Sequence, residues 1–121
     1  MKELTGYVNG LGQPRVRVTI IGDREKIEVD AIIDTGFDGD ICIPVQLAVR
    51  LGLELRSVTW VELANGEKKR ELVFTGSTIF GNAKRDVDII LTESKEVLIG
   101  TNMLSGHILE INFTDKSVKI R

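Results

Sequence analysis

The chain has 121 residues, of which 42% are hydrophobic and 28% charged, and its formal net charge is -2. This length supports a single hydrophobic core, far below the roughly 300 residues at which two lobes are expected, so we expect residues 1–121 to form one domain. The charge gives no indication of nucleic-acid or anionic-membrane binding, and no run approaches the roughly 18 apolar residues of a membrane span. We therefore expect a cytoplasmic protein with neither kind of partner.

The chain has one cysteine and one histidine, and neither lies in a pattern that predicts a metal site or a catalytic nucleophile. Cys42 lies between Ile41 and Ile43 without a basic neighbour, which favours a small core residue over a reactive thiol. A single cysteine also allows no intrachain disulfide, so nothing suggests an oxidising compartment. His107 has no serine, cysteine or second histidine constellation to join, and a surface or capping role is favoured. No cofactor and no metal is predicted.

The first half of the chain contains a hairpin that ends on an acid. Arg15–Ile20 alternates apolar and polar residues with period two, and so does Ile27–Ile33 after a polar turn. Val16, Val18 and Ile20 should face the core. The second strand delivers Asp34 directly after two apolar residues.

Asp34 is placed where its charge needs compensation. An acid that follows a buried strand loses solvation, so its charged form requires hydrogen bonds or a partner. Thr35 can supply a hydroxyl, and Gly36 lets the backbone turn where a Cβ would clash. The simpler alternative is a structural turn, because Asp-Thr-Gly is common in turns.

The middle of the chain predicts a helix and a hairpin. Pro44–Leu51 has proline near its first turn and a glycine after its end, as a short helix does, and a second short helix is expected at Asn102–Leu104. Two extended runs within Val58–Phe74 flank Asn65-Gly66, a strong hairpin signal. Trp60 is expected in the core rather than over a cleft.

The chain also contains a short internal echo. Thr19–Asp23 is followed 59 positions later by the similar Thr78–Asn82, and Val29–Ile33 is followed 58 positions later by Val87–Leu91. We interpret this as internal pseudo-symmetry. In this interpretation Leu98-Ile99-Gly100 takes the place of the Asp34 turn, so the second copy has the scaffold without the acid.

Two motifs together resemble a known family. Asp34-Thr35-Gly36, followed by Asp38 and the apolar Ile41–Ile43, resembles the active-site loop of retropepsin-like (clan AA) aspartic proteases. Downstream, Val97–Leu104 is similar to the apolar-apolar-glycine segment and short helix that pack beside that loop. The resemblance covers about residues 14–113. The segment Asp34-Thr35-Gly36-Phe37 resembles the active-site motif of a group of single-domain prokaryotic proteins within the superfamily.

The resemblance implies an all-β fold, a closed antiparallel barrel with one or two short helices. It also implies an aspartic endopeptidase, in which two carboxylates share a proton while water attacks a peptide bond. Because this chain has one such loop, the second acid would be Asp34 of another copy, so the active unit would be a homodimer acting on a peptide or protein substrate.

The resemblance assigns a role to each site residue. Asp34, Thr35 and Gly36 would be catalytic, with Thr35 anchoring the opposed loops and Gly36 contacting the substrate backbone. Substrate would also contact Phe37, Asp38, and the tip of a mobile flap at Asn65 and Gly66. Phe37 is larger than the residue usual at its position in the family and would narrow the substrate subsites.

Two alternatives remain at this point. A catalytically inactive binding or adaptor module would have the same strands. A calcium loop is suggested by the crowding of Asp34, Asp38, Gly39 and Asp40, but the third position lacks a carboxylate, Val45 occupies the twelfth, and strands flank the segment in place of two helices.

Overall fold

The computed structural model describes residues 2–121, which form ten strands and two short helices. The elements in chain order are β1 (Leu4–Val8), β2 (Pro14–Ile21), β3 (Lys26–Ile33), β4 (Ile41–Pro44), α1 (Val45–Leu51), β5 (Glu54–Glu62), β6 (Lys68–Phe80), β7 (Ala83–Thr92), β8 (Val97–Ile99), α2 (Thr101–Leu104), β9 (Leu109–Asn112) and β10 (Ser117–Ile120). No helix in this part of the chain is long and apolar enough to cross a membrane.

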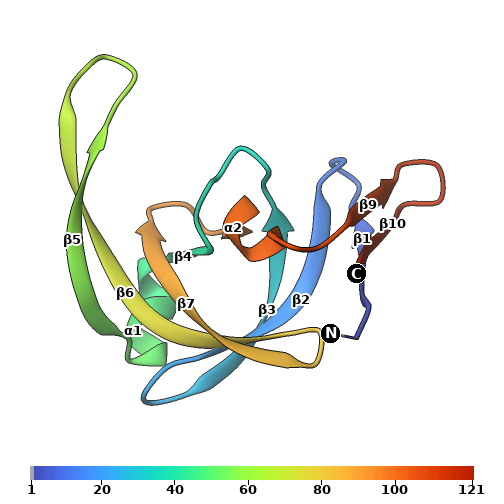
Figure 1. Cartoon of the computed structure of the whole chain (residues 1–121), viewed down its shortest axis with the longest axis horizontal. Coiled ribbons are helices and arrows are strands. Elements are labelled where there is room, and N and C mark those ends of the chain that lie inside the picture. The colour runs from blue at the N-terminus through green and yellow to red at the C-terminus, as the bar shows by residue number, and fades with distance from the viewer. Residues whose placement is uncertain (1) are drawn as a thin grey trace.

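Six strands close into a barrel. The sheet order is β5-β6-β7-β4-β8-β3-β2-β1-β10-β9, and an additional pairing of β6 with β2 closes the ring β2-β3-β8-β4-β7-β6 (Figure 1). Most neighbours are antiparallel, whereas β3 with β8 and β4 with β7 run parallel. The predicted closed all-β barrel with two short helices is confirmed. Two extensions leave it, the β5–β6 hairpin and the β1-β10-β9 edge.

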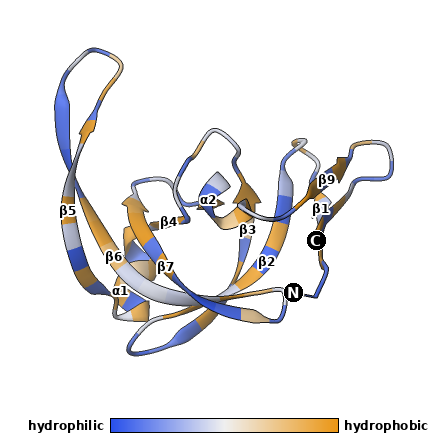
Figure 2. Cartoon of the chain, viewed as in Figure 1, coloured by the Kyte–Doolittle hydropathy of each residue, from blue (hydrophilic) through white to orange (hydrophobic). Residues whose placement is uncertain are grey.

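The core fills the barrel because the strands alternate. Val16, Val18 and Ile20 are at most 2% exposed, as predicted, and Ala31 and Ile33 join them from β3. Figure 2 shows the same alternation as orange and blue segments along β2 and β3. The barrel therefore holds β3 firmly up to its last residue, where the acid follows.

The two helices lie where the sequence predicts them. The helix α1 starts after Pro44, which has no N–H to leave unpaired, and ends at Gly52 with φ 68°. Its end is tied to the β2–β3 turn, because Arg24 N–H donates to the Leu51 carbonyl at 3.0 Å. The helix α2 at Thr101–Leu104 begins one residue earlier than predicted.

The strand pairing has internal two-fold pseudo-symmetry. Exchanging β2, β3 and β4 with β6, β7 and β8 maps the parallel β3–β8 pair onto β7–β4 and leaves β2–β6 and β4–β8 unchanged. One detail of the predicted repeat is wrong. The loop equivalent to the one after β3 is Glu93–Glu96, between β7 and β8, whereas Leu98-Ile99-Gly100 belongs to β8 and the start of α2, the equivalents of β4 and α1.

The β5–β6 hairpin projects from the barrel (Figure 1). Its turn is closed by hydrogen bonds from Leu63 N–H to the Glu67 carbonyl (2.7 Å) and from Glu67 N–H to Asn65 Oδ1 (3.0 Å), with Gly66 at φ 85°. Trp60 on this hairpin is 65% exposed, so the prediction of a core tryptophan is wrong. The part of the hairpin that carries Trp60 stands clear of the barrel, and no core surrounds it.

Candidate functional site

Asp34 stands at the end of β3 with its carboxylate held in place. Its N–H donates to the Ile99 carbonyl at 2.9 Å, which continues the β3–β8 ladder one residue past the strand. Its Oδ1 accepts the Gly36 N–H at 2.9 Å, and its carbonyl accepts the Phe37 N–H at 3.1 Å. This turn fixes a half-buried carboxylate at the end of the strand.

The loop after Asp34 is supported by the start of α2. Gly100 N–H donates to the Asp40 carbonyl (2.9 Å), Thr101 N–H to the Phe37 carbonyl (2.8 Å) and Asn102 N–H to the Gly39 carbonyl (3.2 Å). A Cβ on Gly100 would lie 2.2 Å from the Gly39 carbonyl oxygen, so only glycine fits. The two motifs that the sequence singled out are therefore in direct contact.

Asp40 is a buried anchor of this loop, and sequence reasoning considered it only as a calcium ligand. It is 6% exposed, and its carboxylate accepts hydrogen bonds from Asn102 Nδ2 (2.6 Å) and Asp88 N–H (2.9 Å), with Arg85 at 3.5 Å. The only feature of the sequence that could have indicated a buried anchor at Asp40 was its position directly before the apolar strand that begins at Ile41. Within residues 2–121 no three acidic, histidine or cysteine side chains are grouped to hold a metal ion.

The Phe37 ring packs against the backbone of its own loop. A Cβ built on Gly39 would meet the ring at 2.6 Å, and one on Gly100 would meet it at 2.7 Å. The ring therefore occupies the space that two glycines leave open, and its half-buried side chain helps to join the loop to α2.

The structure brings five of the predicted site residues together and leaves two apart. Asp34 to Asp38 share one loop, in which Thr35, Gly36 and Asp38 are exposed. Asn65 and Gly66 form the tip of the β5–β6 hairpin, which rises on the same side of the barrel as the loop but stands away from it (Figure 1).

A row of apolar residues runs from Asp34 toward the hairpin across five strands. Directly paired neighbours share a face of the sheet, and the pairing joins them in one row, which we call the floor row: Ile32, Leu98, Cys42, Ile90 and Val73. Asp34 lies two positions beyond Ile32 and so leaves β3 on this face. Burial, and secondarily the charge of Glu71, raises the pKa of the Cys42 thiol to about 11, in keeping with the predicted packing role.

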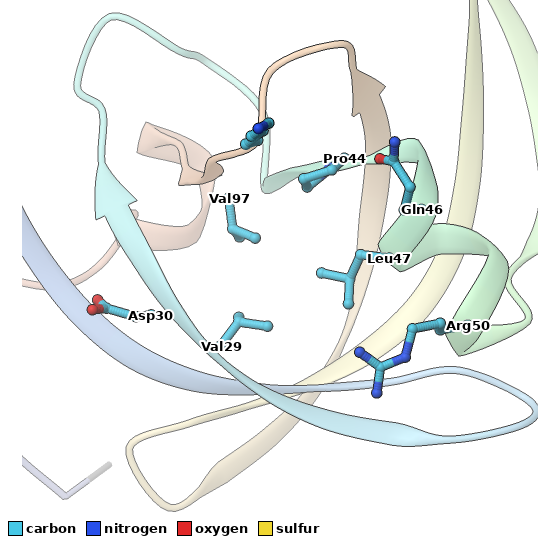
Figure 3. Close-up of a pocket in the computed structure, with 8 residues that line it drawn as sticks. Val29, Asp30, Pro44, Gln46, Leu47, Arg50 and Val97 are labelled. Atoms are coloured by element: carbon cyan, nitrogen blue, oxygen red, sulfur yellow. The ribbon is translucent and has the colours of Figure 1, made fainter.

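The pocket shown in Figure 3 lies elsewhere. It has a volume of about 490 Å³ between β3, β8 and α1, and its lining includes the apolar Val29, Leu47 and Val97 and the basic Arg50 and Lys95. No residue of the Asp34 loop or of the β5–β6 hairpin lines it. It is therefore separate from the candidate site.

Comparisons with known proteins agree with this geometry. A family profile described as "Aspartyl protease" matches residues 16–103. The structure is similar to that of a retropepsin-like aspartic protease from Rickettsia conorii, with a TM-score of 0.74 and 20% identity over 98% of this chain and 89% of the other. It is also similar to the solution structure of Simian Foamy Virus (mac) protease, with a TM-score of 0.57 and 13% identity over 74% and 90%. No curated protein matches the sequence.

Proposed function

Because the chain belongs to the retropepsin-like aspartyl protease family, we propose that it is an aspartic endopeptidase that acts as a homodimer on peptide or protein substrates. The observation that carries the proposal is the Asp34 loop. Its carboxylate is fixed by the Gly36 N–H, and its backbone is supported by α2, so the acid is held in one orientation before substrate arrives.

The proposed reaction uses one Asp34 from each chain. One carboxylate is ionised and takes a proton from water as the water oxygen attacks the peptide carbonyl carbon. The other is protonated and donates its proton to the carbonyl oxygen, which gives a gem-diol. As the C–N bond breaks, the carboxyl that took a proton from water passes it to the leaving amine nitrogen, and the other carboxylate recovers a proton from a gem-diol hydroxyl. Neither step requires a metal or a cofactor.

Thr35 and Gly36 would complete the catalytic loop. The Thr35 side chain is exposed and forms no side-chain hydrogen bond to residues 2–121, so its hydroxyl is free to bond to the partner's loop. Gly36 exposes backbone at which an extended substrate can hydrogen-bond. Asp38 would hold substrate polar groups, Phe37 would limit the space beside the loop, and Asn65 and Gly66 would close over the substrate.

The surface beside β9 supports the homodimer. Strand β9 is a sheet edge, and the residues that flank it, Ile108 and Phe113, are 62% and 63% exposed. Unpaired edges and exposed apolar groups are features that association covers. In Figure 1 the β9–β10 turn, the Asp34 loop and the hairpin tip all project to the same side. A second chain on that side would bring the two Asp34 loops together.

We also propose a cytoplasmic location, since the single buried thiol needs no oxidising compartment.

The test is Asp34→Asn, which preserves shape and removes the acid. Wild type should cleave members of a peptide library with a rate that passes through a maximum in pH, because one carboxylate must be ionised and one protonated. Asp34→Asn should lose cleavage and keep its fold by circular dichroism and its dimer by analytical ultracentrifugation. Retained cleavage in Asp34→Asn would overturn the mechanism. No cleavage by a well-formed wild-type dimer would favour the inactive adaptor.

A further inference from the structure

The β5–β6 hairpin carries a single acid just above the floor row. Glu71 lies on β6 two positions from Val73, the last member of that row, and therefore on the same face of the sheet. Val73 is 7% exposed, Glu71 is half-buried, and Lys69, two positions nearer the tip, is exposed. Glu71 is thus the first charged side chain that an extended chain lying on the floor row would meet on the hairpin.

The electrostatics of Cys42 agree with this placement of Glu71. Its negative charge contributes to the raised pKa of the Cys42 thiol, and Cys42 is the central member of the row. Charge effects of this kind fall off with distance, which agrees with the position of Glu71 and Cys42 on the same face of the sheet.

The Glu71 carboxylate has no partner among residues 2–121. No side-chain hydrogen bond and no ion pair within 4.0 Å reaches it. Across the ladder it faces Thr59, and the nearest cation on its own strand face is Lys69. A half-buried carboxylate beside apolar residues is stabilised when a cation approaches it.

We propose that Glu71 selects substrates with a lysine or arginine side chain, read several residues from the scissile bond. The distance follows from the sheet. Four strand spacings of about 4.8 Å separate β3 from β6, and Asp34 and Glu71 lie two residues to opposite sides of the floor row. The path along the sheet from Asp34 is therefore at most about 23 Å, the length of about seven extended residues. Curvature of the barrel shortens it, which places the basic residue within about seven positions of the scissile bond. This inference rests on the proposed function for the site, but not on catalysis.

The first experiment measures binding without cleavage. Peptides that differ only in lysine or uncharged norleucine at each of seven positions on either side of the centre are titrated against the Asp34→Asn protein by fluorescence anisotropy. One position should bind lysine about five- to tenfold more tightly, and the preference should weaken with added salt. Adding Glu71→Gln should abolish it. Adding Glu62→Gln should leave the lysine preference unchanged, because Glu62 lies opposite Lys68 in the β5–β6 ladder, on the other face of the same hairpin.

The second experiment maps cleavage by the wild-type protein and by Glu71→Lys. Wild type should enrich lysine and arginine at the position found by binding, and Glu71→Lys should shift the enrichment to aspartate and glutamate. Cleavage without a basic preference would overturn this inference and leave the endopeptidase intact. Glu71-dependent binding of basic peptides without any cleavage would support this inference and overturn the proposed endopeptidase. An unchanged lysine preference in Glu71→Gln, or no peptide binding at all, would overturn the inference.

Discussion

Replacing Gly100 by alanine tests whether the contact between the Asp34 loop and α2 holds the site together. The new Cβ would lie 2.2 Å from the Gly39 carbonyl oxygen and 2.7 Å from both the Phe37 carbonyl oxygen and a carbon of its ring. Two of these atoms belong to the backbone and cannot rotate away. The loop must therefore move off α2, which breaks the hydrogen bonds that Thr101 N–H and Asn102 N–H donate to it.

The expected cost combines overpacking with lost hydrogen bonds. Overpacking in a close-packed region costs about 1–3 kcal/mol, and each lost hydrogen bond adds about 1 kcal/mol. We expect Gly100→Ala to lower the free energy of unfolding by about 3–5 kcal/mol. For 121 residues the entropy of unfolding near the midpoint is about 0.25 kcal/mol/K, so the Tm should fall by about 12–20 °C.

Thermal unfolding followed by circular dichroism measures this loss, with urea unfolding as a second determination. Gly10→Ala is the matched control, because a Cβ on Gly10 has no heavy atom within 4 Å, and its Tm should stay within about 2 °C of wild type. A Gly100→Ala protein with wild-type stability would show that the loop does not rest on α2 as described.

Three further predictions address the thiol, the hairpin and the edge strand. Because the Cys42 pKa is about 11 in the folded chain against an ordinary 9.0, the unfolded chain loses the proton first. Stability should therefore fall by up to about 3 kcal/mol as pH rises from 9 to 11, a decline that pH-dependent urea unfolding should find reduced in Cys42→Ala. Amides of the β5–β6 hairpin should exchange rapidly in the free protein and slow down with a statine-type transition-state analogue; equal exchange in both would contradict closure. Phe113→Asp should raise the dimer Kd about a hundredfold or more in sedimentation equilibrium, whereas Val49→Asp, also 63% exposed but on α1, should not.

The parts of the fold that the sequence predicts are those set by local pattern. Period-two alternation located β2 and β3 and therefore the strand end at Asp34, and proline and glycine placed α1 within one residue. The same reasoning failed for Trp60, because a strand pattern does not reveal whether a hairpin lies on the barrel or projects from it. Exposure of Trp60 depends on how far β5 and β6 extend beyond the barrel.

Asp40 shows the limit more clearly. Its partners Asn102 and Asp88 lie 62 and 48 positions away, and they meet Asp40 only because β4 pairs with both β7 and β8. No local pattern encodes those contacts. The resemblance to a family identified the two loops, but their connection through a buried carboxylate follows from the sheet order alone.

The internal pseudo-symmetry leads to a final prediction, on Glu93. This acid follows β7 as Asp34 follows β3, but its loop has four residues where the Asp34 loop has seven, and it contains no glycine. The other acid of this loop, Glu96, forms an ion pair with Arg15 at 2.7 Å.

The loop after β7 therefore does not reproduce the Asp34 loop, and in the proposed mechanism the partner acid comes from another chain. Glu93→Gln should retain wild-type kcat/KM toward a cleaved peptide, while mixing wild type with excess Asp34→Asn should reduce specific activity as inactive heterodimers form. Loss of activity in Glu93→Gln, or activity unaffected by the mixing, would place the second acid within one chain and refute the homodimer.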